Sequence, residues 1–168
     1  MEQLHQIYET LGAHTLPAWE ELPDFELYMD QVLSLVGRYL WKLPDSGERP
    51  LTASMVNNYV KLKVLPPPVR KRYDRTHVAR LLMICILKPV LPISDIQLLL
   101  EPLGEEEAVE AFYRRFCALY AQANGELVQA AAQTDAADAD LILQAALRSQ
   151  AQQNAALSLL AAGIEDEP

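Results

Sequence analysis

Four polar side chains recur at helical spacing between residues 54 and 61, and their chemistry suits the reading of a nucleic acid. Asparagine offers a donor and an acceptor that match the edge of adenine, and lysine donates to guanine. Two asparagines in mid-helix are unusual, because asparagine is a poor helix former. We therefore predict that this face enters a DNA major groove, although a solvated helix face explains the same pattern. The residues are Ser54, Asn57, Asn58 and Lys61.

Positive charge gathers in the segment that surrounds this helix face. Between residues 38 and 88 the chain has eleven basic and three acidic side chains, a net charge of +8 in a chain whose total is −9. Lysine and arginine bind phosphate without regard to base sequence. We therefore expect the basic side chains next to the polar face to hold a DNA backbone. These residues are Lys63, Arg70, Lys71, Arg72 and Arg75.

Catalytic chemistry has little support in the chain. There is no glycine-rich phosphate loop, no cluster of cysteine and histidine at metal-ligand spacing, and no nucleophile motif. The three histidines, His5, His14 and His77, are scattered. We expect a protein that is not an enzyme, with no catalytic residues, no metal and no cofactor.

Apolar periodicity predicts an all-α fold, with at most a two-stranded ribbon between Pro66 and Tyr73. Apolar residues recur at spacings of three and four, which is typical of amphipathic helices. Asp24, Thr52 or Ser54, and Asp74 are suited to cap helix N-termini. The apolar run Leu81–Leu87 predicts a buried central helix. The predicted helices cover residues 2–11, 24–43, about 54–63, 75–88, a short segment after Ser94, and two long segments after Glu105 and after Asp138 or Asp140.

The long segment after Glu105 has an apolar stripe, made of Val109, Phe112, Phe116, Leu119, Ala123 and Leu127. The chain from Ala121 to Ala162 is rich in alanine and glutamine. Such a small-sided face packs closely on another helix or on a second copy, so we expect a homodimer through the helices after Glu105. The expected organisation is an N-terminal helix and connection (1–23), a helix-turn-helix core (24–103), C-terminal helices (104–163) and an acidic tail (164–168).

Cellular location is indicated by what the composition excludes. Cys85 and Cys117 lie in apolar helical contexts and are expected to be small buried hydrophobes, so a reducing cytoplasm fits. The start of the chain lacks the pattern of a secretory signal. The longest apolar run is far shorter than the ~20 residues that a membrane span needs. We expect a cytoplasmic protein with no membrane partner.

The central stretch resembles the DNA-binding half of MerR-type transcriptional regulators. In that family a recognition helix runs into Leu-Leu-Pro-Pro, then a basic wing, then a tyrosine that starts the next helix. Here Asn58-Tyr59 leads to Val64-Leu65-Pro66-Pro67, and Arg70-Lys71-Arg72-Tyr73 falls where the wing ends. The resemblance implies a winged helix-turn-helix core that binds double-stranded DNA. In this chain Asn57 stands where the family has arginine, and Lys63 where it has glycine before Leu-Leu.

A second resemblance covers residues 22–120. The strings Leu22-Pro23-Asp24, Asn57-Asn58-Tyr59-Val60-Lys61 and Ile93-Ser94-Asp95-Ile96 are similar to the bacterial family called domain of unknown function 1836. That family is uncharacterised. The resemblance therefore implies a bacterial cytoplasmic protein with a helical fold, but it does not point to any particular activity.

Together these features favour a DNA-binding transcriptional regulator. A non-catalytic helical interaction module that kept the fold without DNA binding is the alternative. The net charge of −17 outside residues 38–88 supports this alternative, since it opposes binding to a polyanion.

Overall fold

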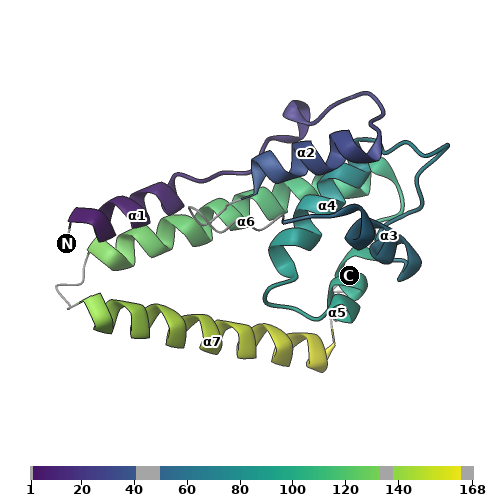
Figure 1. Ribbon diagram of the computed structural model, residues 1–168. Helices are drawn as coiled ribbons and strands as arrows, with labels where there is room; N and C mark the ends of the chain where they lie inside the picture. Colours follow the sequence, from purple (N-terminus) through teal and green to yellow (C-terminus); the bar gives the residue numbers. More distant parts are fainter. Residues whose placement is uncertain (1, 41–49, 133–137, 164–168) are drawn as a thin grey trace. The chain divides into compact units, whose positions relative to one another are not determined.

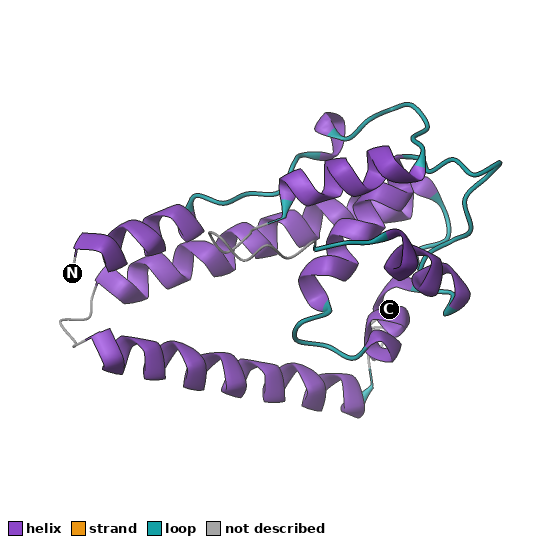
Figure 2. Cartoon of the chain, viewed as in Figure 1, coloured by secondary structure: helices purple, strands orange, loops and turns teal. Residues whose placement is uncertain are grey.

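The computed structural model describes residues 2–40, 50–132 and 138–163, and all regular structure in these residues is helical (Figures 1 and 2). The all-α prediction is confirmed for this part of the chain. A single turn of 3-10 helix, η1, lies at Trp19–Glu21. The α-helices are α1 (Glu2–Gly12), α2 (Met29–Tyr39), α3 (Ala53–Lys61), α4 (Arg75–Leu87), α5 (Ile93–Leu100), α6 (Glu106–Ala132) and α7 (Asp138–Ala162).

The chain forms two compact units. The central unit comprises residues 15–121, and the terminal unit comprises residues 1–14 with 122–168. Helix α6 contributes to both units. The predicted acidic tail at 164–168 lies outside the described residues, as do residues 41–49 and 133–137.

Helix α4 is the centre of the central unit, as its apolar run predicts. Residues Val78 to Ile84 are all buried. Helix α2 packs on α3 and α4, and α5 packs on α4. These neighbours bury Val36, Val56 and Ile96 completely. Burial of a side chain of this size stabilises the fold by about 1.5–3 kcal/mol each.

Two of the predicted helix caps are present. Thr52, rather than Ser54, caps α3, and its Oγ1 accepts a hydrogen bond from Met55 N at 3.3 Å. Asp74 caps α4, where its Oδ1 accepts from His77 N at 3.1 Å. A side-chain oxygen at this position satisfies one of the N–H groups that a helix start leaves unpaired.

The predicted start of the second helix at Asp24 is wrong. Helix α2 begins at Met29, and the preceding residues are extended because Leu27 and Tyr73 exchange two backbone hydrogen bonds of 2.8 and 2.9 Å. The side chain of Gln31 accepts from Tyr28 N at 2.9 Å and so stabilises the later start. Pairing with a distant segment overrides the local helical pattern. Helix α2 ends at Tyr39, and the remainder of the predicted span, 41–43, is not described.

The apolar stripe of α6 is buried at Val109 and more exposed further along. Leu119 and Leu127 are 57% and 41% exposed. Tyr113, which was not in the predicted stripe, is fully buried and donates its hydroxyl hydrogen bond to Pro17 O at 3.0 Å. The hydrogen bond to Pro17 O thus helps to bury a tyrosine that a pattern of apolar residues does not include.

In the terminal unit, α1 and the second half of α6 approach closely at Gly12. A Cβ atom at this position would collide with the side chain of Val128. Nearby, Asn124 Nδ2 donates to His14 O at 3.2 Å. Glycine is therefore required here by the short distance between the two helices.

Candidate nucleic-acid interface

Helix α3 presents its polar residues outward. Ser54, Asn57, Asn58 and Lys61 are all exposed, while Val56 and Tyr59 on the opposite side are buried. The spacing of three and four residues places the four exposed side chains on one helix face. The backbone of this short helix is fixed at its start by Thr52 and along its length by the two buried side chains.

The end of α3 is closed by a left-handed residue, Lys63. Its N–H donates to Val60 O at 3.0 Å, and Val64 N donates to Tyr59 O at 3.0 Å, which is the Schellman arrangement. Lys63 has a φ of 60° and an exposed side chain. Glycine is the usual residue at this position, because a left-handed conformation costs other L-residues roughly 1–2 kcal/mol. This is also the position where the MerR-type pattern has glycine.

A hairpin of minimal length displays Arg70 and Lys71. Val69 N donates to Arg72 O at 3.1 Å, and Arg72 N donates back to Val69 O at 2.9 Å. The two residues between them have φ angles of 51° and 64°. Positive φ at both central positions defines a type I′ turn, for which Asn-Gly is the preferred sequence. This turn is the only ribbon-like feature between Pro66 and Tyr73, within the limit that the sequence predicts.

Among the residues that the structure describes, only three apart from glycine have positive φ, and all three are basic: Lys63, Arg70 and Lys71. All three side chains are exposed. Strained backbone conformations persist where the rest of the fold holds them, and they concentrate at functional sites. Three basic residues thus occupy positions where glycine or asparagine would adopt the backbone conformation at a lower cost in free energy.

Arg72 lies at the base of the hairpin and is held by the protein itself. Its Nη2 donates to Tyr28 Oη at 2.9 Å, and its guanidinium lies 4.7 Å from the centre of the Tyr28 ring. Glu26 lies 3.9 Å from Arg72 Nε, a surface ion pair of small energy. Together with the Leu27–Tyr73 pairing, these contacts fix the hairpin on the extended segment before α2. No short-range sequence signal points to Tyr28 or Glu26, because Tyr28 is 44 residues from Arg72.

Arg75 is also engaged within the fold. Its Nε donates to Leu22 O at 3.2 Å, and its guanidinium lies 5.6 Å from the centre of the buried Trp19 ring. The structure therefore divides the nine predicted site residues into two groups. Arg72 and Arg75 support the hairpin and the start of α4. The residues with exposed side chains are Ser54, Asn57, Asn58, Lys61, Lys63, Arg70 and Lys71.

The family model described as Domain of unknown function (DUF1836) matches residues 17–116. The chain belongs to this family. The match covers α2 to α5, the hairpin and all nine predicted site residues, and it ends within α6. No curated protein and no solved structure matches the chain.

Arg80 lies within the residues that the family model matches. It adds to the net positive charge of residues 38–88, but its side chain is buried. It is 5% exposed, and Nη1 donates to Leu100 O at 3.0 Å while Nη2 donates to Leu103 O. Burial lowers the pKa of its guanidinium. Because the bonded carbonyls lie at the C-terminal end of α5, the cation interacts favourably with the helix dipole. Arg80 therefore joins α4 to α5 and is unavailable to a ligand.

The N-terminus of α4 combines a carboxylate and an imidazole. His77 Nδ1 lies 2.7 Å from Asp74 Oδ1, and Thr76 Oγ1 donates to the same oxygen at 2.6 Å. The contact with His77, followed by the smaller effect of Thr76, holds the pKa of Asp74 well below its ordinary value. His77 is 4% exposed, so it is a buried capping residue.

Other reactive groups are unremarkable in the described residues. Cys85 and Cys117 are free and half-buried, less enclosed than predicted. Burial raises the pKa of Cys85 to about 12, so its thiol is protonated at neutral pH. No group of three histidine, cysteine or acidic side chains there is arranged to hold a metal ion. None of the helices in these residues has both the length and the apolar character needed to cross a membrane.

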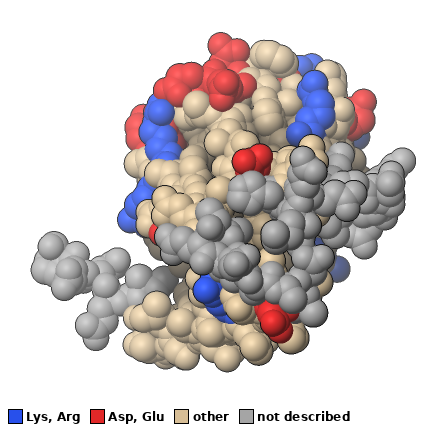
Figure 3. Space-filling view, turned by 90° about the vertical axis from the view of Figure 1, so that its left-hand side faces the viewer, with Lys and Arg blue, Asp and Glu red and all other residues tan. Residues whose placement is uncertain are grey.

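Positive charge is not clustered on every face of the molecule. On the face drawn in Figure 3, the described lysine and arginine side chains are separated by acidic and uncharged residues. Lys63, Arg70 and Lys71 share a left-handed backbone conformation, which the turn after α3 and the hairpin impose.

Proposed function

We propose that the protein is a DNA-binding transcriptional regulator that acts in the cytoplasm, with a MerR-like winged helix-turn-helix core in which α3 reads bases and the Val69–Arg72 hairpin is a short wing. The proposed partner is double-stranded DNA. Binding to it requires no cofactor, no metal and no catalysis. Two such cores act together in a homodimer formed by the helices after Glu105.

The observation that carries this proposal is the occurrence of Lys63, Arg70 and Lys71 at positive φ. Each position costs stability that glycine or asparagine would recover. A basic side chain retained at such a position is best explained by a function of its charge. Phosphate binding is that function, because Lys and Arg are the main donors to DNA backbones.

The exposed face of α3 supports base reading. Asn57 and Asn58 can pair with adenine through two hydrogen bonds, and Lys61 can donate to guanine in the major groove. Helix α3 has only nine residues, so a few side chains would carry the sequence preference. Dimerisation follows from the geometry of such recognition, because paired half-sites require a symmetric protein.

The test measures binding to a random pool of DNA duplexes at several salt concentrations, by fluorescence anisotropy. Each phosphate that the protein neutralises contributes about −0.9 to the slope of log affinity against log salt. The double substitution Arg70→Asn with Lys71→Gly gives the turn its preferred sequence while it removes both charges. We expect it to flatten the slope by about 2 and to weaken binding to all sequences alike.

Two further variants make this test specific. Lys88→Gln removes an exposed charge outside the hairpin, and we expect it to leave the slope unchanged. Asn58→Ala should leave the slope unchanged but reduce the preference among sequences by about 1–3 kcal/mol. Absence of wild-type binding at ~50 mM salt, where backbone contacts are strong, would remove the DNA proposal.

A helical protein-interaction module is the second candidate, and exposed apolar side chains favour it. Phe25, Tyr28 and Val69 are 62%, 50% and 63% exposed. Phe25 also lines a groove of about 430 Å³ along α2. Exposed aromatic residues beside arginine are frequent in protein interfaces. In this case the basic hairpin would bind an acidic protein, and no duplex would bind.

A further inference from the structure

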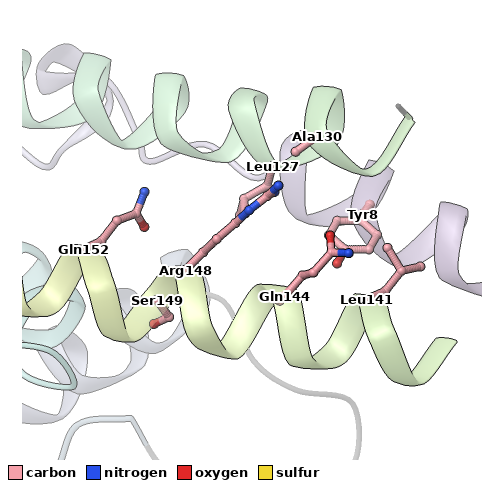
Figure 4. A pocket seen from close by; sticks show the side chains of 9 residues that line it. Tyr8, Leu127, Ala130, Leu141, Gln144, Arg148, Ser149 and Gln152 are labelled. Atoms are coloured by element: carbon pink, nitrogen blue, oxygen red, sulfur yellow. The ribbon is translucent and has the colours of Figure 1, made fainter. Parts of the chain in front are cut away.

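Helix α7 turns a side of mixed polarity toward the rest of the terminal unit, with Leu141 and Ala145 beside several polar residues. A cavity of about 90 Å³ lies between α7, α1 and α6, and it is lined by Tyr8 of α1 and Leu127 of α6. From α7 the lining includes Gln144, Arg148 and Gln152. Figure 4 shows these three side chains extending from α7 toward α6. Polar groups and a cavity are unusual on the inner face of a helix that packs within a single chain.

Three large apolar side chains of α7 do not line that cavity, whereas Leu141 does. Ile142, Leu143 and Leu147 are 65%, 58% and 69% exposed, and Ala146 between them is also exposed. Residues separated by one, three and four positions form one continuous patch on a helix surface. Helix α7 therefore has an apolar patch on its exposed side, unlike an ordinary surface helix, whose apolar stripe faces the core.

Charge indicates what covers this patch. Between Leu141 and Ala162 the only charged residue is Arg148, and Arg148 lines the cavity on the inner side. The four residues of the patch are uncharged, and the exposed Asp140 lies one turn before Leu143 on α7, in a chain whose net charge is −9. Two copies of so acidic a chain repel each other, and a neutral apolar face is where they approach with the least repulsion. A basic partner would instead be attracted to the acidic surfaces elsewhere on the chain.

We infer that the patch formed by Ile142, Leu143, Ala146 and Leu147 docks on the same patch of a second copy, so that two α7 helices cross at Leu143 and Leu147. A two-fold interface is self-complementary, and a compact patch centred on an i, i+4 leucine pair satisfies that requirement. The inference rests on the proposed function for its purpose, the pairing of two DNA-binding cores. Its physical basis lies in α7 alone, which is outside the family match.

The test is the molar mass of the full-length protein at tens of micromolar, by light scattering after size-exclusion chromatography. The wild type should have twice the mass of one chain. The double substitution Leu143→Glu with Leu147→Glu places four carboxylates together at the crossing, so the mass should fall to that of one chain. Leu159→Glu is the matched control: Leu159 lies on the same helix, is 71% exposed, and is outside the patch, so this variant should stay dimeric.

Folding and function are separated from assembly by two additional readouts. Far-UV circular dichroism should show the same helical signal for both variants and the wild type, since the altered side chains are exposed. A wild-type monomer, or a dimer that survives the double substitution, would overturn the inference. A dimer that binds no duplex would retain this interface and reject only the DNA proposal, while a monomer that binds DNA would do the reverse.

Discussion

At the scale of single residues, Lys63 combines a basic side chain with a backbone conformation that favours glycine. Its φ of 60° and its hydrogen bond to Val60 O place it where glycine normally ends a helix. A lysine here lowers the stability of the fold, and nothing in the local contacts recovers the loss. The side chain points to solvent, where its charge is free to meet a phosphate.

Replacing Lys63 by glycine should therefore raise the free energy of unfolding by about 0.5–1 kcal/mol, because glycine adopts the left-handed conformation without strain. Urea denaturation followed by circular dichroism measures the change. Lys61→Gly is the matched control: Lys61 is helical, so glycine there should lower stability by about 1 kcal/mol. If the lysine serves DNA binding, the more stable Lys63→Gly protein should bind duplexes less tightly; equal or tighter binding would remove Lys63 from the interface.

At the scale of elements, the N-terminus of α4 sets the position of both the central helix and the hairpin. Tyr73 pairs with Leu27, Asp74 caps α4, and the rings of His77 and Tyr73 pack nearly perpendicular to each other at 5.4 Å between ring centres. The cap is local in sequence, which is why the start of α4 was predicted correctly. The pairing is distant, which is why the start of α2 was not.

The Asp74 carboxylate should make stability depend on pH in the acid range. Its pKa in the fold is lowered from an ordinary value of 3.8, so the folded state favours the ionised form. The stabilisation is complete above about pH 4 and is lost as the pH falls through the lowered pKa. In Asp74→Asn, asparagine still caps the helix, but this titration is absent.

The free energy of unfolding of Asp74→Asn is measured by urea denaturation from pH 7 to pH 2. Below pH 4 it should accordingly fall less steeply with decreasing pH than that of the wild type. Asp24→Asn is the control for the chemical change itself, since Asp24 caps no helix in the structure and this variant should keep the stability of the wild type at pH 7. Parallel curves for Asp74→Asn and the wild type would show that the cap does not depend on charge.

How far the sequence predicts this molecule depends on the range of the interactions. Apolar periodicity and a local cap identify α4, and the polar spacing from Ser54 to Lys61 identifies the exposed face of α3. The buried Tyr113 was missed because its anchor, Pro17 O, is 96 residues away. The internal roles of Arg72 and Arg75 were missed for the same reason. The positive φ angles of Arg70 and Lys71 were also out of reach, because neither residue is typical of a type I′ turn.

At the scale of the whole molecule, the proposed homodimer would couple assembly to stability. If a second copy covers the outer face of α7, folding of that unit is linked to association, and the stability then depends on protein concentration. Proteins that fold as monomers show no such dependence. The net negative charge of the chain would oppose association of two copies through its acidic surfaces.

The melting temperature of the wild type should therefore rise as its concentration is increased from about 1 to 100 μM, in line with mass action. The Leu143→Glu, Leu147→Glu variant should melt at one temperature throughout that range. Differential scanning calorimetry measures both. A wild-type melting temperature that stays constant would place the interface, if there is one, outside the cooperative fold.

The hydrogen bond between Arg72 and Tyr28 spans 44 residues, so it can form only after a long loop has closed. Loop closure costs entropy before any contact rewards it, and contacts of this kind usually form after the folding transition state. A chain that is still folding carries the same positive charges on a flexible segment, without the geometry of the hairpin. Loss of the Tyr28 hydroxyl would then accelerate unfolding while the rate of folding stays the same. The lifetime of the basic tip, rather than its formation, is what Tyr28 controls.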